Sequence, residues 1–245
     1  MAEISPLRNS QAALRPDPGV PQEESLAGLI REIFPREAAK PVSCRKRHFI
    51  FHQGDRVGAV WCVMSGLVAL ERVDEDGRMA IFGIMKTGAV LAWQDLIGGG
   101  MHRNSAETLS PCEVVSIPSP VFRSALGNEE RLVTALMQQA AAQVGAYEEH
   151  ILRLSTLEVS ERLYSTLCAL ADKSEAEGDT VEFAVPVRRR DLAAMIGTSP
   201  EGVSRGIRRL EELEVAEFSS RSVVRLRIGR AGHGADPGTP PARRR

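Results

Sequence analysis

The sequence lacks any long apolar run. Its longest apolar stretches, such as "AVLAW" and "GAVWCVM", fall far short of the roughly 20 residues that a helix needs to cross a bilayer. Its Met-Ala-Glu start also lacks the basic and then apolar regions of a secretory signal. We therefore expect a protein without a membrane span that works in the cytoplasm.

Cysteine is scarce and widely spaced. The four cysteines, at positions 44, 62, 112 and 168, form neither a disulfide framework nor a tight metal-binding knuckle. Reduced and mostly buried thiols are the expectation. The chain also lacks a phosphate-binding loop, a nucleophile elbow, a zinc signature and a convincing pair of catalytic carboxylates. These absences argue against an enzyme and against a bound metal.

Net charge is almost absent as well, at −1 over 245 residues. The whole chain therefore has no electrostatic attraction to nucleic acid, and any basic surface has to be local. One segment meets this condition: between Arg188 and Arg230, ten arginines stand against six acidic residues, a local charge of +4. Arginine suits phosphate and guanine because its guanidinium presents paired donors.

Composition and periodicity divide the chain into five parts. Residues 1–24 are rich in proline and residues 230–245 run through Gly, Pro, Ala and Arg, so both tails are expected to be disordered. Over 25–127, a short amphipathic helix precedes short strands separated by turn glycines, which is typical of a β-sandwich or a barrel-like roll. A long helix is expected over 128–156 and a smaller domain over 157–229. The expected fold class is α+β.

The long helix carries a heptad pattern. Asn128 is placed to cap it, with Glu129 and Glu130 in the first turn, where the helix dipole favours acidic side chains. Apolar residues then recur at alternating steps of four and three, as in the seam between two coiled helices. These residues are Val133, Met137, Ala140, Val144, Tyr147, Ile151 and Leu154. We expect a homodimer joined along this seam; the alternative is a single helix packed on its own domain.

The segment that starts at Arg189 has the spacing of a helix-turn-helix. Ala193, Gly197 and Val203 stand at its fifth, ninth and fifteenth positions. A small residue at the fifth position lets two helices cross closely, and glycine at the ninth makes the turn. We therefore expect the second helix of this unit to lie in the major groove of double-stranded DNA.

The second helix begins with a proline. If Ser199 is the N-cap, Pro200 falls at the first helical position, where its fixed φ suits the helix and its missing N–H costs nothing. Alternatively, Thr198 is the N-cap and Glu201 completes a capping box with it.

Three residues of this helix are candidate base readers, because Glu201, Ser204 and Arg205 recur at steps of three and four along one face. Arg205 can pair with O6 and N7 of guanine, and Glu201 can accept a hydrogen bond from the amino group of cytosine. Ser204 can contact a base or a phosphate.

Further polar residues around the unit are candidates for phosphate contacts, which position a protein on DNA without reading sequence. They are Arg188, Arg189, Arg190, Ser199, Arg208, Arg209 and Arg221. The stretch "EFSSRSVVRLRI" alternates apolar residues with arginines around a turn at 219–221. This pattern predicts a wing hairpin beside the recognition helix.

In these features the sequence resembles the Crp/Fnr family of bacterial transcription regulators over residues 26–229. The resemblance rests on "F-x-x-G-D" at 51–55, "V-M-S-G-L-V" at 63–68, "K-T-G-A-V" at 86–90 and the segment "RRRDLAAMIGTSPEGVSRGIRRLEELEV". It implies a cyclic-nucleotide-binding-like β-roll, a dimerisation helix and a C-terminal winged helix-turn-helix, with RNA polymerase as a further partner.

The same resemblance assigns the recognition helix to a branch. Glu201, Ser204 and Arg205 are similar to the E-x-x-S-R element of the Fnr branch, whose dimers bind palindromes of the type TTGAT…ATCAA. The cyclic-AMP branch carries E-x-x-x-R without that serine.

The resemblance leaves the cofactor and the effector unknown. Where cyclic-AMP binders hold the ribose with glutamate and the phosphate with arginine, this chain has Trp93 and Asn104, so cyclic AMP is not expected. An Fnr-type [4Fe-4S] cluster needs three cysteines near the N-terminus, and residues 1–43 contain none. A haem held near His48 and His52, or redox control through Cys62 or Cys112, stays an alternative. A member without a cofactor is the default.

The expected function is therefore a homodimeric, sequence-specific transcription regulator. A ligand-gated regulatory module of another protein is the rival reading, because similar β-rolls occur there. The helix-turn-helix and the local excess of arginine argue against it.

Overall fold

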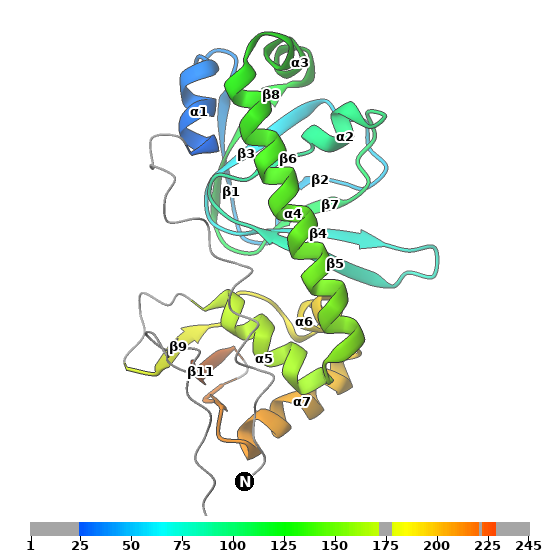
Figure 1. Cartoon of the computed structure of the whole chain (residues 1–245), viewed down its shortest axis with the longest axis vertical. Helices are drawn as coiled ribbons and strands as arrows, with labels where there is room; N and C mark the ends of the chain where they lie inside the picture. The colour runs from blue at the N-terminus through cyan, green and yellow to red at the C-terminus, as the bar shows by residue number, and fades with distance from the viewer. Residues whose placement is uncertain (1–24, 172–177, 221, 229–245) are drawn as a thin grey trace, which may run out of the picture.

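The computed structural model of the chain describes residues 25–171, 178–220 and 222–228. The tails expected at 1–24 and 230–245 lie outside the described residues. The mixed α and β architecture confirms the α+β class predicted from the sequence. In Figure 1 a β-roll occupies the upper half, a long helix runs down its front, and a smaller helical domain lies below.

Two antiparallel sheets face each other to form the roll. One sheet has the strand order β1-β8-β3-β6 and the other β2-β7-β4-β5. Their apolar side chains meet in one core, to which Val60, Val114 and Ile117 contribute without any exposure. The strands are β1 Lys40–Cys44, β2 Phe49–Phe51, β3 Ala59–Ser65, β4 Val68–Val73, β5 Met79–Met85, β6 Val90–Leu91, β7 Ser105–Thr108 and β8 Cys112–Pro118.

Helices close the roll at its upper end (Figure 1). Helix α1 (Leu26–Ile33) begins at Ser25, whose Oγ accepts a hydrogen bond from the N–H of Gly28 at 3.2 Å. Phe34 then stacks on Phe122 of helix α3 (Ser119–Asn128), with the ring centroids 5.8 Å apart. The short helix α2 (Trp93–Ile97) packs Trp93 and Leu96 into the core of the roll.

The long helix α4 (Glu130–Thr156) begins later than the sequence predicts. Asn128 does not cap it; this residue ends α3, and its side-chain amide donates to the carbonyl of Ser124 at 2.7 Å. Glu129 forms the break between the two helices, with φ −117° and ψ 88°. The side-chain amide of Asn128 thus bonds the helix that precedes it. The reason is the break at Glu129, which the local sequence does not reveal.

The C-terminal domain combines three helices with a small sheet. Helix α5 (Val159–Leu170) leads through the linker to β9 (Thr180–Ala184), which pairs with β11 (Val223–Arg227), the middle strand of the order β10-β11-β9. Helices α6 (Arg189–Ile196) and α7 (Pro200–Glu212) and strand β10 (Ala216–Phe218) complete the domain. Its core holds Leu167, Ile196 and Leu210, all almost fully buried.

The core of this domain continues into the roll. Ala69, Ile81 and Leu109 of the roll belong to the same buried cluster as the side chains of α5, α6 and α7. Strand β5 and helix α6 lie against each other at this boundary. The two halves of the molecule therefore share one apolar interface instead of meeting only through α4.

Candidate nucleic-acid interface

Helices α6 and α7 form the helix-turn-helix that the spacing predicts. Gly197 ends α6 in the left-handed conformation, with φ 63°, which glycine adopts without a steric cost. Ala193 is buried at 3% exposure where the two helices approach each other. Both residues therefore play the structural parts expected from their positions.

The start of α7 follows the first of the two cap assignments. Ser199 is the N-cap, and its Oγ accepts a hydrogen bond from the N–H of Gly202 at 3.2 Å. Pro200 is the first helical residue, as predicted. The alternative assignment, with Thr198 as the N-cap, is therefore wrong.

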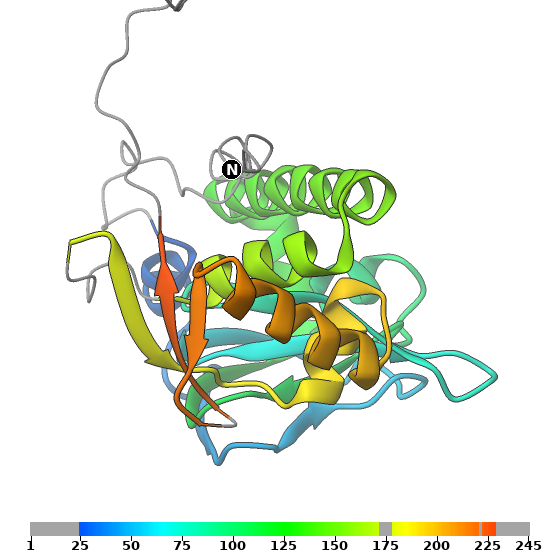
Figure 2. The same cartoon turned by 90° about the horizontal axis from the view of Figure 1, so that it is seen from below.

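Helix α7 has one buried and one exposed face. Val203, Ile207 and Leu210 pack into the domain core. Glu201 and Arg205 are exposed on the opposite face, with Ser204 half-buried between them. Seen from below in Figure 2, α7 lies at the surface of the molecule away from the roll, beside the three-stranded sheet.

Ser204 is held by two hydrogen bonds at the crossing of the two helices. Its Oγ donates to the carbonyl of Pro200 at 3.0 Å and accepts from Nη1 of Arg189 at 3.0 Å. The pair links the first residue of α6 to the centre of α7. Sequence reasoning placed both residues at the interface but did not find this contact between them.

Glu201 turns back toward the first turn of its own helix. Hydrogen bonds to its carboxylate from its own backbone N–H and from the hydroxyl of Ser199 lower its pKa below the usual value. Arg205 is a further, weaker cause of the lower pKa. The lowered pKa favours the ionised carboxylate, which accepts hydrogen bonds from a donor such as an amino group.

The candidate phosphate-binding arginines lie in two groups. Arg188, Arg189 and Arg190 are exposed at the start of α6. Arg208 is exposed on α7, while Arg209 pairs with Glu212 at 3.2 Å. Arg221, the remaining candidate, lies outside the described residues.

The predicted wing hairpin is present, formed by β10 and β11. Val224 and Leu226 are fully buried, and the intervening Arg225 points outward. Its guanidinium pairs with Glu182 of β9 at 2.9 Å and approaches Glu217 of β10 at 3.8 Å. This arginine therefore belongs to the sheet's own ion pairs.

An open groove of about 460 Å³ runs between the start of α5 and helix α7. Arg162, Arg205 and Arg209 line it, together with Gly202 and Gly206. Arg162 and Arg205 bring positive charge to this side of the recognition helix, whereas Arg209 pairs with Glu212 and Glu158 also lines the groove. A phosphate backbone beside α7 would meet this charge.

Helix α4 presents an apolar stripe to solvent. Among the predicted seam residues, Met137, Val144, Ile151 and Leu154 are exposed by 52%, 55%, 62% and 37%. Ala140 packs against the roll core instead, and Tyr147 lines a cavity in the roll. Val133 is half-buried, and Leu152, which the heptad pattern does not include, is 54% exposed.

Two family models match the chain, one over the roll and one over the C-terminal domain. Residues 41–129 match the model of the cyclic nucleotide-binding domain, and residues 161–228 match the model of the Crp-like helix-turn-helix domain. The nitrogen fixation regulation protein FixK of Azorhizobium caulinodans is 28% identical over 93% of each chain. The cAMP-activated global transcriptional regulator CRP of Salmonella typhimurium is 24% identical, over 71% of this chain and 84% of its own.

A solved structure of a similar protein has the same fold. FixK2 from Bradyrhizobium japonicum superposes with a TM-score of 0.66 at 26% identity, over 77% of this chain and 92% of its own. The chain is a Crp/Fnr-type DNA-binding transcription regulator. Proteins of this kind bind DNA and act as dimers, and the family consists of regulators and not enzymes. Within the described residues, no helix combines the length and the apolar content of a membrane span.

In this Crp/Fnr regulator, the roll contains a small cavity. It measures about 50 Å³ and lies between the roll and α4. Amide side chains join its walls: Nε2 of Gln94 donates to Oε1 of Gln143 at 2.7 Å, and Gln139 bonds the backbone of Val90 at both its N–H and its carbonyl, at 2.8 and 2.9 Å.

A cation lines this cavity beside Asn104, the residue that stands where a cyclic phosphate would need one. This cation is Arg103, and its Nε donates to Oδ1 of Asp95 at 2.7 Å. Asp95 is the residue that holds this cation at the cavity, although the Arg103 side chain stays 64% exposed.

The histidines and the cysteines of the alternatives differ in exposure. His48 and His52 are both exposed, and Cys62 and Cys112 are both buried. Burial raises the pKa of the Cys62 thiol to about 12. Among the described residues, metal-ligating side chains do not gather in groups of three.

Proposed function

We propose that two copies of this regulator bind a two-fold DNA site of the TTGAT-like type. Each copy lays α7 in one major groove, about one helical turn of DNA from the other. Glu201, Ser204 and Arg205 read base edges there. The single observation that carries the proposal is the exposed stripe on α7, on the face opposite Val203, Ile207 and Leu210.

The apolar stripe on α4 supports the dimer. Met137, Val144 and Ile151 are large apolar side chains that each leave more than half of their surface exposed. Their steps of seven are those of a seam between two coiled helices. Two copies of α4 that pair along this stripe would remove it from water.

The arginines of α6 and α7 support a large electrostatic share of the affinity. Arg188, Arg189 and Arg190 are exposed at the start of α6, and Ser199 and Arg208 are exposed at the start of α7 and along it. Contacts from these residues to phosphates would release counterions, so the affinity would fall as salt rises. We place Arg209 and Arg221 in the same role.

We also propose a protein partner, a cellular location and the absence of a cofactor. The relatives named as transcription regulators support contact with RNA polymerase on the bound promoter and a place in the cytoplasm. The small cavity of the roll supports a member that does not use cyclic AMP. Without the N-terminal cysteines, a resident [4Fe-4S] cluster of the Fnr type is not part of the proposal.

A binding titration with matched duplexes tests the base readers. Arg205→Ala should remove about 1–3 kcal/mol of discrimination at one guanine of each half-site, while binding to unrelated DNA persists. Arg78→Ala is the matched control, because Arg78 lies on the β4–β5 turn with its side chain 81% exposed. If Arg205→Ala discriminates between the duplexes as the wild type does, the assignment is wrong.

A further inference from the structure

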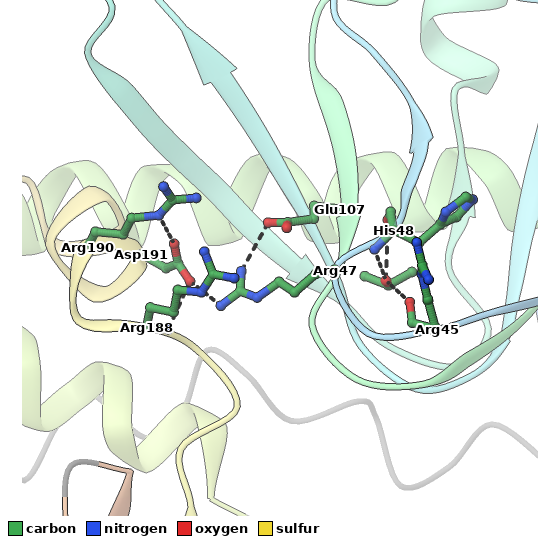
Figure 3. A network of polar contacts seen from close by, with 8 residues as sticks. Arg45, Arg47, His48, Glu107, Arg188, Arg190 and Asp191 are labelled. Atoms are coloured by element: carbon green, nitrogen blue, oxygen red, sulfur yellow. Dashed lines mark hydrogen bonds and ion pairs between the residues drawn. The ribbon is translucent and has the colours of Figure 1, made fainter.

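One arginine of the roll reaches across the boundary to the DNA-binding domain. Arg47 follows β1, and its Nη2 lies 2.7 Å from Oδ2 of Asp191, the third residue of α6. Its Nη1 lies 3.0 Å from Oε2 of Glu107 on β7. The side chains of Arg47, Glu107 and Asp191 are 15%, 8% and 2% exposed, so the bridge is largely shielded from water. Figure 3 shows it from close by.

The roll end of this bridge is fixed by its backbone. The N–H of Arg47 donates to the carbonyl of Thr108 at 2.8 Å, and Oγ1 of Thr108 donates to the carbonyl of Arg45 at 2.7 Å. The same Oγ1 accepts from the N–H of His48 at 2.9 Å. Arg47 itself has φ 67°, a conformation that a non-glycine residue keeps only where its surroundings hold it. The guanidinium therefore projects from a loop that these hydrogen bonds hold to β7.

The other end is fixed to the helix that supports DNA recognition. Oδ2 of Asp191 accepts from the backbone N–H of Arg188 at 2.8 Å, and its Oδ1 accepts from Nε of Arg190 at 3.3 Å. Asp191 thus caps the first turn of α6, from which the exposed Arg188, Arg189 and Arg190 project. Through the bond from Arg189 to Ser204, the same turn contacts the middle of α7.

The hydrogen bonds of this bridge depend on the relative orientation of the two domains, whereas the apolar contacts around it do not. Contacts of Ala69, Ile81 and Leu109 with the helical domain are nondirectional, so they resist separation more than rotation. A planar guanidinium that bonds one carboxylate on each side fixes an angle as well as a distance. A change in that angle would move α7 of one copy relative to α7 of the other.

We propose that Arg47 is a positioning residue for DNA recognition: its bridge between Glu107 and Asp191 sets the angle of α6 and α7 on the roll. It thereby sets the separation of the two recognition helices in the dimer. This inference rests on the proposed function, in which two copies read a two-fold site. The roll takes part in the choice of half-site spacing without contacting DNA.

The test is a series of palindromes whose half-sites are separated by spacers of different length. Arg47→Met with Glu107→Gln removes the bridge without leaving the Glu107 carboxylate buried and unpaired. We expect the wild type to prefer one spacer and the double variant to lose that preference, with the ratio of affinities falling roughly two- to thirtyfold. Affinity for a single half-site should not change.

A second variant keeps the test valid if the first one does not unfold cooperatively. Asp191→Asn leaves the pair of Arg47 and Glu107 within the roll and retains an oxygen that can accept from Arg188. It removes the charge on the other side of the boundary, so the same loss of spacer preference is expected, to a smaller degree. Arg131→Met is the matched control, because it removes an ion pair with Glu32 at 2.8 Å that lies away from the boundary.

The outcomes separate this inference from the function on which it rests. A wild type without any spacer preference would overturn the two-fold site and the positioning role together. A wild-type preference that both variants retain overturns the positioning role alone. Tighter binding by the variants with an unchanged spacer preference would also overturn it. The bridge would then lower the DNA affinity without setting the spacing.

Discussion

Gly206 of α7 lies directly against Leu163 of α5. A methyl group added to Gly206 would stand 3.2 Å from Cδ2 of Leu163 and 3.7 Å from the Cα of Ser160. Helix α5 therefore approaches the recognition helix closely where the side chain is missing. This approach explains why α7 tolerates a residue that weakens an isolated helix by about 1 kcal/mol relative to alanine.

Gly206→Val should destabilise the protein by about 1–3 kcal/mol, because its side chain overfills the contact with Leu163. Thermal or denaturant unfolding measures the change. Glu211→Val, at an exposed position of the same helix, is the control and should cost only a few tenths of a kcal/mol. Equal stability of the two variants would contradict the close packing of α5 on α7.

Charge on the apolar stripe of α4 should separate the two copies. We expect Val144→Glu, at a residue 55% exposed in the single chain, to shift the protein from dimer to monomer in sedimentation experiments. Gln138→Glu carries the same charge at an exposed position off the stripe and should leave the dimer intact. A Val144→Glu protein that sediments as a dimer would place the contact elsewhere.

Stability should depend on pH through Glu71, which is 7% exposed beside the bridge of Arg47. Burial, followed by the charges of Glu107 and Asp191, raises the pKa of this carboxyl above its usual value. Its contribution to stability is therefore complete below the unfolded pKa, near 4.5, and is lost as pH rises through the folded pKa.

Glu71→Gln should therefore raise the free energy of unfolding at pH 7, by on the order of 1 kcal/mol. The gain should shrink as pH falls through 4.5 and further below it, where the wild-type carboxyl becomes protonated in both states. Glu75→Gln, on the exposed β4–β5 turn, is the control and should not change the profile. A gain that does not shrink as pH falls would show that ionisation of Glu71 is not its cause.

Cyclic AMP should leave the DNA affinity unchanged. The cavity of about 50 Å³ is far below the ~300–1,000 Å³ of typical ligand pockets, and Gln94 and Gln143 bridge its walls. Anisotropy titrations with and without millimolar cyclic AMP measure the effect, with 5′-AMP as the control for ionic strength. Stimulation by cyclic AMP alone would mean that α4 can move away from the roll.

Much of the fold follows from local patterns. The helix-turn-helix was predictable because Ala193, Gly197 and Pro200 each act within a few residues of themselves, through close crossing, a left-handed turn and a helix start. The exposed position of Arg205 follows from helical periodicity in the same way. The strands of the roll were predictable as short segments between turn glycines, although their pairing was not.

Some assignments failed because they depend on distant partners. Asn128 reads as an N-cap but ends the preceding helix, and Ala140 and Tyr147 fit the heptad yet face the roll. Arg103 could not be placed in the cavity without knowing that Asp95 lies beside it. Asp191 reads as an ordinary first-turn acid, and the sequence offers no sign of its partner.

The sequence by itself determined the order of the parts and the exposed face of the recognition helix, because both depend on interactions between residues a few positions apart. Tertiary structure alone decided which face of α4 is left exposed, how small the cavity of the roll is, and that Arg47 meets Asp191. That last pair is separated by 144 positions. Folding brings the two charges together in a site shielded from water, and no local pattern records the geometry of such a contact.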